Sequence, residues 1–151
     1  MDDIVLRENE IDVETYLGLR RAVDWKRLTV GQAQAALDAS LFTLCAYAVD
    51  GQTGRAQPIG MGRIVGDGAV ICYVQDLIVV PEYRHEGVGH MLLDRLTEYV
   101  ESITADGTEM MFDLMCAIGR EEFYKQHGFI ARPTDTLGPG MIQYIDKRKA
   151  D

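Results

Sequence analysis

Apolar residues in the N-terminal part of the chain recur at the three-to-four-residue spacing of amphipathic helices. Asp12 precedes the first such run and belongs to the residue types that cap helices, which predicts a helix ending at about residue 23. Thr29 and Gln32 have the spacing of a capping box and predict the start of a second helix. A short strand at residues 4–6 comes first, so two helices are expected before the main sheet.

The middle of the chain is rich in apolar and β-branched residues, which is typical of strands. Residues 41–49 and 58–65 are separated by a polar, glycine-containing stretch and predict a hairpin. Residues 70–80 form a nearly continuous apolar run that only Gln75 and Asp76 interrupt. We expect this strand to be covered on both faces, because a strand with one wet face would alternate apolar and polar residues.

The second half of the chain repeats the alternation of strand and helix. Pro81 and a glycine-containing loop lead into an amphipathic pattern that predicts a helix from Val88 to about residue 102. Behind it we expect a strand at 110–117, a short helix at 120–127 ended by Gly128, and two last strands at 129–132 and 141–145. The pattern contains no repeat, low-complexity segment or linker, so residues 1–151 are expected to form a single domain.

Charge narrows the set of partners. The 151-residue chain carries a formal net charge of −9, with a pI near 4.7. Its long-range field opposes general binding to nucleic acid and to anionic membranes, so an anionic ligand would need a local binding device. The same charge suits a cationic amine substrate, and it also serves solubility alone.

Cysteine usage and the first residues indicate a cytoplasmic protein. Cys45, Cys72 and Cys116 are odd in number, lie in apolar segments and form no Cys-x-x-Cys pair, so we expect buried, reduced thiols and no metal. The N-terminus lacks the basic and apolar regions of a signal peptide, and no apolar run has the length of a membrane span.

The most informative stretch joins the strand at 70–80 to the helix at Val88. Arg84, Gly87 and Gly89 have the spacing Arg-x-x-Gly-x-Gly and open a helix whose first N–H groups lack partners inside the helix. These amides, the positive end of the helix dipole and the small glycines suit a pyrophosphate, although a tight strand-to-helix turn would need the same glycines.

Other motifs that share parts of this pattern do not fit. A dinucleotide fold would require a third glycine where Leu92 stands, and no Gly-x-x-x-x-Gly-Lys-Ser/Thr follows. His85-Glu86 with His90 resembles a zinc-protease motif, but that motif needs its second histidine where Gly89 stands. The sequence therefore favours a phosphate loop of another kind.

The chain resembles the GNAT superfamily of N-acetyltransferases. The family signature, Arg/Gln-x-x-Gly-x-Gly/Ala after a hydrophobic strand, is met by Arg84, Gly87 and Gly89, and a second motif, an aromatic and Tyr before Gly-Phe, by the segment Phe123 to Phe129. The resemblance implies an α/β (α+β) fold. It has a mixed, mostly antiparallel sheet of six to seven strands with a splayed parallel pair, and about four helices on both faces.

The resemblance also assigns roles to residues. It implies that acetyl-CoA is the acyl donor, without a metal, and that Tyr124 protonates the departing thiolate, although Tyr124 also fits the role of a core aromatic. Backbone groups of Ile78, Val79 and Val80 would hold the pantetheine arm. The pyrophosphate would lie on Arg84, His85, Glu86, Gly87, Val88, Gly89 and His90. The family often has an Asn after the second splayed strand, and this chain has none there.

The acceptor side is less well defined. An alkylamine is neutral in roughly one molecule in a few thousand at pH 7, so a base or a desolvating pocket must favour the free amine. The strand positions where relatives often place a base are Tyr73 and Gln75, and neither is a good base, which leaves water-mediated deprotonation. Asp76 is expected on the opposite side of the strand from Tyr73 and Gln75, unless a bulge turns it. We expect it to pair with a residue such as Arg63. Trp25 either lines the acceptor pocket or anchors a solvated helix face.

These observations predict an N-acetyltransferase that acts on a primary amine of a small molecule by direct attack. Two alternatives stay open, namely acetylation of a protein N-terminus or lysine, and a non-catalytic module that senses acyl-CoA. The absence of a good base on the strand at 70–80 supports the second alternative, and Tyr124 argues against it. Relatives often dimerise through late strands, which leaves open a homodimer that uses residues 141–145.

Overall fold

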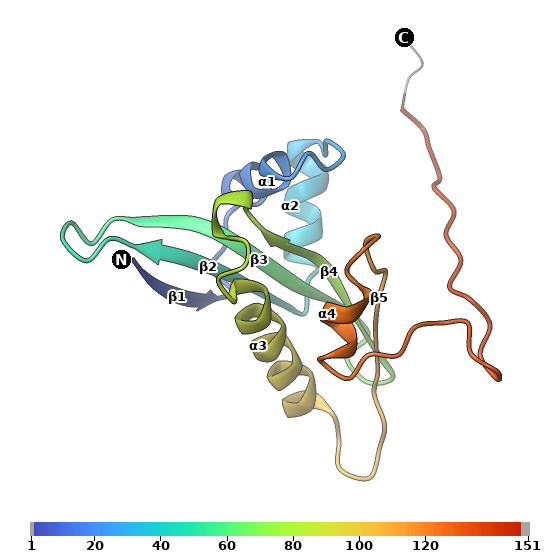
Figure 1. The fold of residues 1–151 in the computed structure, drawn as a ribbon. Coiled ribbons are helices and arrows are strands. Elements are labelled where there is room, and N and C mark those ends of the chain that lie inside the picture. Colours follow the sequence, from blue (N-terminus) through green and yellow to red (C-terminus); the bar gives the residue numbers. More distant parts are fainter. Residues whose placement is uncertain (1, 149–151) are drawn as a thin grey trace. The chain divides into compact units, whose positions relative to one another are not determined.

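The computed structural model describes residues 2–148 and contains five strands and four α-helices within that range (Figure 1). The strands are β1 (Asp3–Glu8), β2 (Phe42–Val49), β3 (Ala56–Gly66), β4 (Ile71–Val79) and β5 (Met111–Leu114). The α-helices are α1 (Val13–Ala22), α2 (Val30–Asp38), α3 (Val88–Ile103) and α4 (Glu121–Lys125), and a short 3₁₀ helix, η1, covers Pro81–Tyr83.

The strands form one sheet in the order β1-β2-β3-β4-β5, in which every neighbouring pair is antiparallel except β4 and β5. The mixed α/β class and the parallel pair are confirmed, but the predicted six to seven strands are wrong. Residues 129–132 and 141–145 contain no strand, and β5 ends at Leu114 instead of residue 117. An apolar run becomes a strand only where a neighbouring strand pairs with it, and Met141 is 88% exposed.

The α3 face of the sheet, which is the face that α3 covers, is held by apolar packing. Leu92, Leu93 and Leu96 of α3 are fully buried. Gly60 and Gly62 of β3 let the helix approach closely, since a Cβ at Gly62 would lie 2.7 Å from Leu96 Cδ1. The predicted amphipathic helix is therefore confirmed, and its apolar stripe forms the main core.

The opposite side, called the α1 face, is covered by α1 and α2 (Figure 1). Both helices begin at the predicted caps. Asp12 accepts a hydrogen bond from the Thr15 amide at 2.8 Å, and the Thr29 hydroxyl accepts one from the Gln32 amide at 3.0 Å. These caps satisfy backbone donors that have no partner inside the helix.

The chain divides into two compact units, one up to Leu114 and one from Met115 onward. The first unit holds the sheet with α1, α2 and α3, and the second holds α4. All three cysteines are unpaired, and Cys45 and Cys72 are buried as expected. Cys116 is exposed, contrary to the prediction, because it lies beyond the end of β5. No helix among residues 2–148 combines the length and the hydrophobicity that crossing a bilayer requires.

Candidate functional site

The loop between β4 and α3 has an unusual backbone. After η1, the amide of Arg84 donates to the Pro81 carbonyl at 3.3 Å, and His85 then adopts a positive φ of 67°. Gly87 is the N-cap of α3 with φ 81°, and the helix begins when the Met91 amide donates to the Gly87 carbonyl at 3.0 Å. A Cβ at Gly87 would meet no atom within 4 Å, so the glycine is required for its left-handed conformation and not for lack of space.

This loop presents the start of α3 to solvent without a side-chain cap. Gly87 has no side chain with which to accept from the first helical amides, and buried Val88 anchors the turn against the core. Arg84, His85, Glu86 and His90 are exposed around it. An uncapped helix N-terminus with a positive dipole end is a place where an anion is stabilised.

The end of β4 directs backbone groups away from β3. The Val80 amide donates to the Ile59 carbonyl at 2.9 Å, and Val79 is in register with Gly60. Successive residues of an antiparallel pair alternate in direction, so the N–H and C=O of Val79 point to the opposite edge of β4. On that edge the pairing of β5 with β4 begins at Ile71 and ends at Val74, so β5 does not reach Val79. The three predicted pantetheine residues therefore differ, and Val79 is the one whose backbone faces this edge.

A β-bulge interrupts β4 just beyond the part that pairs with β5. Gln75 is in register with Arg63 and Ile78 with Met61, so Asp76 and the residue after it oppose the single Gly62. Asp76 takes a positive φ of 59°. Because of this extra residue, Gln75 and Asp76 both lie on the α1 face, whereas a regular strand would place them on opposite faces.

Asp76 is the centre of a buried ion cluster, which confirms its predicted pairing with Arg63. Its Oδ2 accepts from Arg63 Nε at 2.7 Å, and its Oδ1 accepts from Arg20 Nη1 at 2.7 Å. The Tyr16 hydroxyl also donates to Oδ2, and burial together with this bond raises the pKa of Tyr16. Both carboxylate oxygens are thus occupied, so Asp76 ties α1 to the bulge and is not available as a base.

Arg20 extends the cluster to the turn after α1. Its Nη2 donates to the Lys26 carbonyl at 2.8 Å, and its guanidinium carbon lies 5.5 Å from the centre of the Trp25 ring. Trp25 is 40% exposed. The ring therefore packs on Arg20 on one side and remains accessible on another, a geometry compatible with both predicted roles of Trp25.

Tyr73 and Gln75 are half-buried on the α1 face, on either side of the last β4–β5 pair. Tyr73 is in register with Asp113 of β5, a residue that the sequence reasoning missed. Burial raises the pKa of the Asp113 carboxyl, an effect that a hydrogen bond to its own backbone partly offsets. A signal was present in the sequence, because Asp113 is the only charged residue in the predicted strand at 110–117.

Tyr124 lies in the second unit. It is half-buried in α4, with its ring 5.1 Å from Phe123 and 5.9 Å from Phe129. The helix is shorter than predicted, and Gly128 follows it with φ 89°. The second predicted motif therefore forms an aromatic cluster within its own unit.

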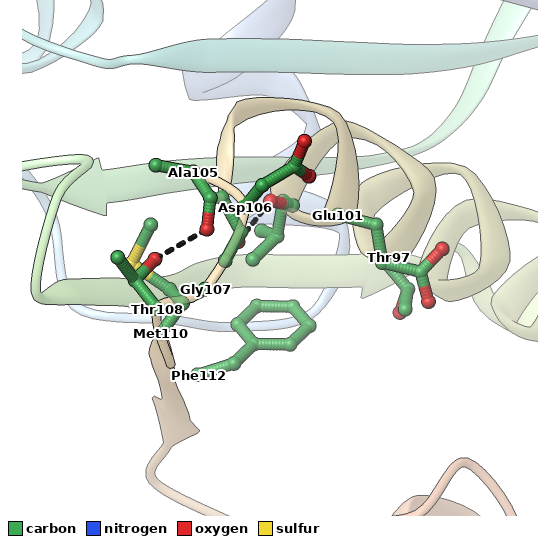
Figure 2. Close-up of a pocket in the computed structure, with 10 residues that line it drawn as sticks. Thr97, Glu101, Ala105, Asp106, Gly107, Thr108, Met110 and Phe112 are labelled. Atoms are coloured by element: carbon green, nitrogen blue, oxygen red, sulfur yellow. Dashed lines mark hydrogen bonds between the residues drawn. The ribbon is translucent and has the colours of Figure 1, made fainter.

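The first unit also contains cavities. A cavity of about 500 Å³ is at the C-terminal end of α3, far along the helix from Gly87, and its lining includes Glu101, Asp106 and Phe112 (Figure 2). A second one of about 450 Å³ lies between α1 and β3 and reaches Val80 and Glu82. Carboxylates line both cavities, which disfavours an anionic ligand there. Across residues 2–148 there is no group of three or more His, Cys, Asp or Glu that could hold a metal ion.

Comparison with known families gives one match, which covers most of the first unit and, in the second unit, the segment from Phe123 to Phe129. The model of the acetyltransferase (GNAT) domain matches residues 43–131, which is more than half of the chain. In the first unit the match includes β4, the glycine loop and α3, and in the second it includes α4.

Two plant proteins are similar in sequence. GCN5-related N-acetyltransferase 2, chloroplastic, of Arabidopsis thaliana is 28% identical over 143 residues, which cover 85% of this chain and 54% of that protein. Histone acetyltransferase TAP1 of Glycine max is 27% identical over 134 residues, with 85% and 56% covered. The chain thus spans about half the length of these relatives.

Solved structures agree with the fold. A GNAT-family acetyltransferase from Streptococcus pneumoniae is 26% identical with a TM-score of 0.73, and the match covers 97% of this chain and 100% of that one. A probable acetyltransferase from Staphylococcus aureus gives a TM-score of 0.77 at 24% identity, with 94% and 100% covered.

Proposed function

Because the chain belongs to the GNAT family of acetyltransferases, we propose that it transfers an acetyl group from acetyl-CoA to the nitrogen of a primary amine. The observation that carries this proposal is the loop at Gly87, where a left-handed glycine opens α3 without a side-chain cap. A diphosphate is the part of acetyl-CoA that such a helix start would recognise. The exposed side chain of Arg84 adds a positive charge beside it.

The donor-binding residues follow from the same geometry. The diphosphate would be held by Arg84, His85, Glu86, Gly87, Val88, Gly89 and His90. The amide and carbonyl of Val79 face the edge of β4 beyond β5, and would pair with the amide groups of the pantetheine arm. A bound pantetheine arm would extend the sheet at this edge, in the manner of an added strand.

The acetyl donor supplies an activated thioester, and the protein must bring an unprotonated amine to it. Family resemblance assigns protonation of the leaving thiolate to Tyr124, and we retain this role as part of the proposal. The exposed ring of Trp25 and the half-buried Tyr73 and Gln75 are the proposed acceptor-side residues. One feature supports direct attack, since the described residues of the α1 face include no Ser–His or Cys–His pair.

The acceptor is proposed to be a small-molecule amine, because a net charge of −9 attracts cations. A second candidate is a basic protein, which the same charge suits and which the name of the soybean relative supports. Cytoplasmic location and a homodimer through residues 141–145 remain part of the proposal. The exposed Met141, Ile142 and Ile145 favour a partner for that segment.

The diphosphate site is tested by placing a charge at Gly89. Gly89→Glu and Gly89→Gln add side chains of nearly equal size, so their difference isolates the charge. We expect Gly89→Glu to bind acetyl-CoA roughly tenfold more weakly than Gly89→Gln, because a carboxylate near the diphosphate repels it. Isothermal titration calorimetry at two salt concentrations measures this, and the difference should shrink at high salt.

An acidic residue in the first helical turn otherwise stabilises a helix through its dipole. The glutamate variant should therefore melt no lower than the glutamine variant while it binds acetyl-CoA more weakly. Equal affinity of the two variants would remove the diphosphate from this loop. Release of CoA thiol with phenethylamine, spermidine, glucosamine and a lysine peptide then tests the transfer itself and separates the two acceptor classes.

A further inference from the structure

The α1 face carries a carboxylate that the ion cluster does not use. Asp113 is in register with Tyr73, one residue before Val74 and Leu114 form the last pair of β4 and β5. Tyr73 shares its face with Arg63, because the β3–β4 register runs without interruption between Arg63 and Val65. Residues in register on neighbouring strands point to the same face, so Asp113 lies on the α1 face where the two strands stop pairing.

The surroundings of Asp113 differ from those of Asp76. Its Oδ1 is buried and has no hydrogen-bond partner among the described residues, although the residue as a whole is only half-buried. The two arginines of the ion cluster, Arg20 and Arg63, both form their ion pairs with Asp76. Other titratable groups on this face include the phenols of Tyr16 and Tyr73 and the buried thiol of Cys45, which is in register with Met61. Asp113 thus has a carboxylate oxygen that can accept a hydrogen bond or a proton from a bound ligand.

We propose that Asp113 accepts the proton that the acceptor ammonium must lose before its nitrogen attacks the thioester. This inference rests on the proposed acetyl transfer and supplies the base that β4 lacks. The position is suitable because the thioester would enter where β4 and β5 diverge, and Asp113 is at that point on the side of the acceptor. Burial adds to its suitability, since a raised carboxyl pKa brings a proton acceptor closer to neutral pH.

The proton balance is simple. The ammonium gives one proton to the Asp113 carboxylate, which leaves a neutral amine and a carboxylic acid. The nitrogen lone pair forms a C–N bond to the acetyl carbon, and the C–S bond breaks with its electron pair on sulfur. The nitrogen then loses a second proton as the amide forms, which balances the proton that the thiolate takes up. The single net proton leaves from Asp113 to water.

The test compares an alkylamine with an amine that needs no base. Phenethylamine is protonated at pH 7, whereas O-benzylhydroxylamine has nearly the same shape and is neutral, because oxygen next to nitrogen lowers its basicity. If the enzyme accepts a different alkylamine, that amine is compared with the alkoxyamine in which oxygen replaces the carbon next to nitrogen. We expect Asp113→Asn to lower kcat/KM for the alkylamine by about 10²- to 10⁴-fold. For the alkoxyamine the loss should fall below about tenfold.

Two controls exclude a structural explanation. Asp106→Asn, in the exposed loop before β5, should leave both rates unchanged. The melting temperature of Asp113→Asn at pH 7 should equal or exceed that of the wild type. The folded-state pKa of Asp113 is raised, so its ionised form destabilises the fold as pH rises through that pKa, and asparagine removes this effect.

The outcomes separate the two proposals. Equal loss with both amines, or no loss with the alkylamine, overturns the role of Asp113 and leaves acetyl transfer in place. Absence of CoA release by the wild type with every acceptor overturns acetyl transfer, and the role of Asp113 with it. Tyr124→Phe should lower both rates by the same factor, because protonation of the thiolate does not depend on the basicity of the amine.

Discussion

The two faces of the sheet are held by different forces. On the α3 face, Leu92 and Leu96 pack on the backbone at Gly60 and Gly62, and the contacts are apolar. On the α1 face, a buried carboxylate with two arginines and a tyrosine joins α1 to the bulge of β4. Apolar packing tolerates small errors of geometry, whereas a buried charge is stable only when its partners are correctly placed.

This difference teaches where function is to be sought. A buried ion cluster is seldom the cheapest way to stabilise a fold, since apolar residues of similar volume often do so equally well. On the α1 face the cluster fixes a bulge that puts Gln75 and Asp76 on one side, next to the end of β5. The polar face thus holds the candidate acceptor site, and the apolar face supports it.

The comparison is tested most strongly at Asp76. Asp76→Ala leaves Arg20 and Arg63, whose side chains are 11% exposed, without their buried partner. We expect the free energy of unfolding to fall by about 3–5 kcal/mol. Urea denaturation measures this loss. Glu8→Gln, at the more exposed pair with Arg95, should leave the midpoint almost unchanged and serves as the matched control.

A second variant shows whether an unpaired charge causes the loss. Arg63→Met combined with Asp76→Ala removes two members of the cluster together. The double variant should be less destabilised than the sum of the two single variants, because each single variant loses the Arg63–Asp76 ion pair and the double variant loses it only once. If the two losses of unfolding free energy were strictly additive, the ion pair would contribute no coupling energy, and the contrast between the two faces of the sheet would disappear.

The sequence predicted features set by local spacing better than features set by pairing across the sheet. Helix α3 and the caps Asp12 and Thr29 follow from local spacing, and the structure has them where they were predicted. The bulge at Asp76 could not be predicted with the same certainty, because it depends on the register between β3 and β4. The role of Asp113 was missed for the same reason, since its face is set by pairing with Tyr73 across the sheet.

The prediction of strands at 129–132 and 141–145 was wrong because it, too, depended on pairing with another strand. Their composition suits strands, but composition does not show whether a partner strand is present. The residues of the glycine loop were identified from spacing, and the structure adds the left-handed backbone at Gly87. The loop before α3 thus followed from local spacing, whereas the register of β4 with β5, which sets the face of Asp113, did not.

The second prediction concerns the close approach on the α3 face. At Gly60 an added Cβ would lie 2.7 Å from the backbone oxygen of Ile78, and at Gly62 it would lie 2.7 Å from the end of the flexible Leu96 side chain. A side chain can rotate away, whereas a strand backbone cannot. Gly60→Ala should therefore cost about 1–3 kcal/mol, and Gly62→Ala clearly less. Equal losses in urea denaturation would show that the Leu96 side chain cannot rotate away from an added Cβ.

The smallest expected effect is at the helix cap that begins the α1 face. The carboxylate of Asp12 accepts the Thr15 amide, and this hydrogen bond lowers the pKa of Asp12. Asp12→Ala should cost about 0.5–2 kcal/mol at pH 7, and Asp12→Asn less, since asparagine also caps helices.

A lowered carboxyl pKa adds stability above the unfolded pKa of about 4, and this stability is lost as pH falls through the folded-state pKa. The difference between the wild type and Asp12→Ala should thus narrow in acid, whereas the cost of Gly60→Ala should not change with pH. If thermal melts from pH 7 to pH 3 gave parallel curves for both variants, the charge of Asp12 would contribute nothing, and electrostatics would distinguish the α1 face only at the buried cluster.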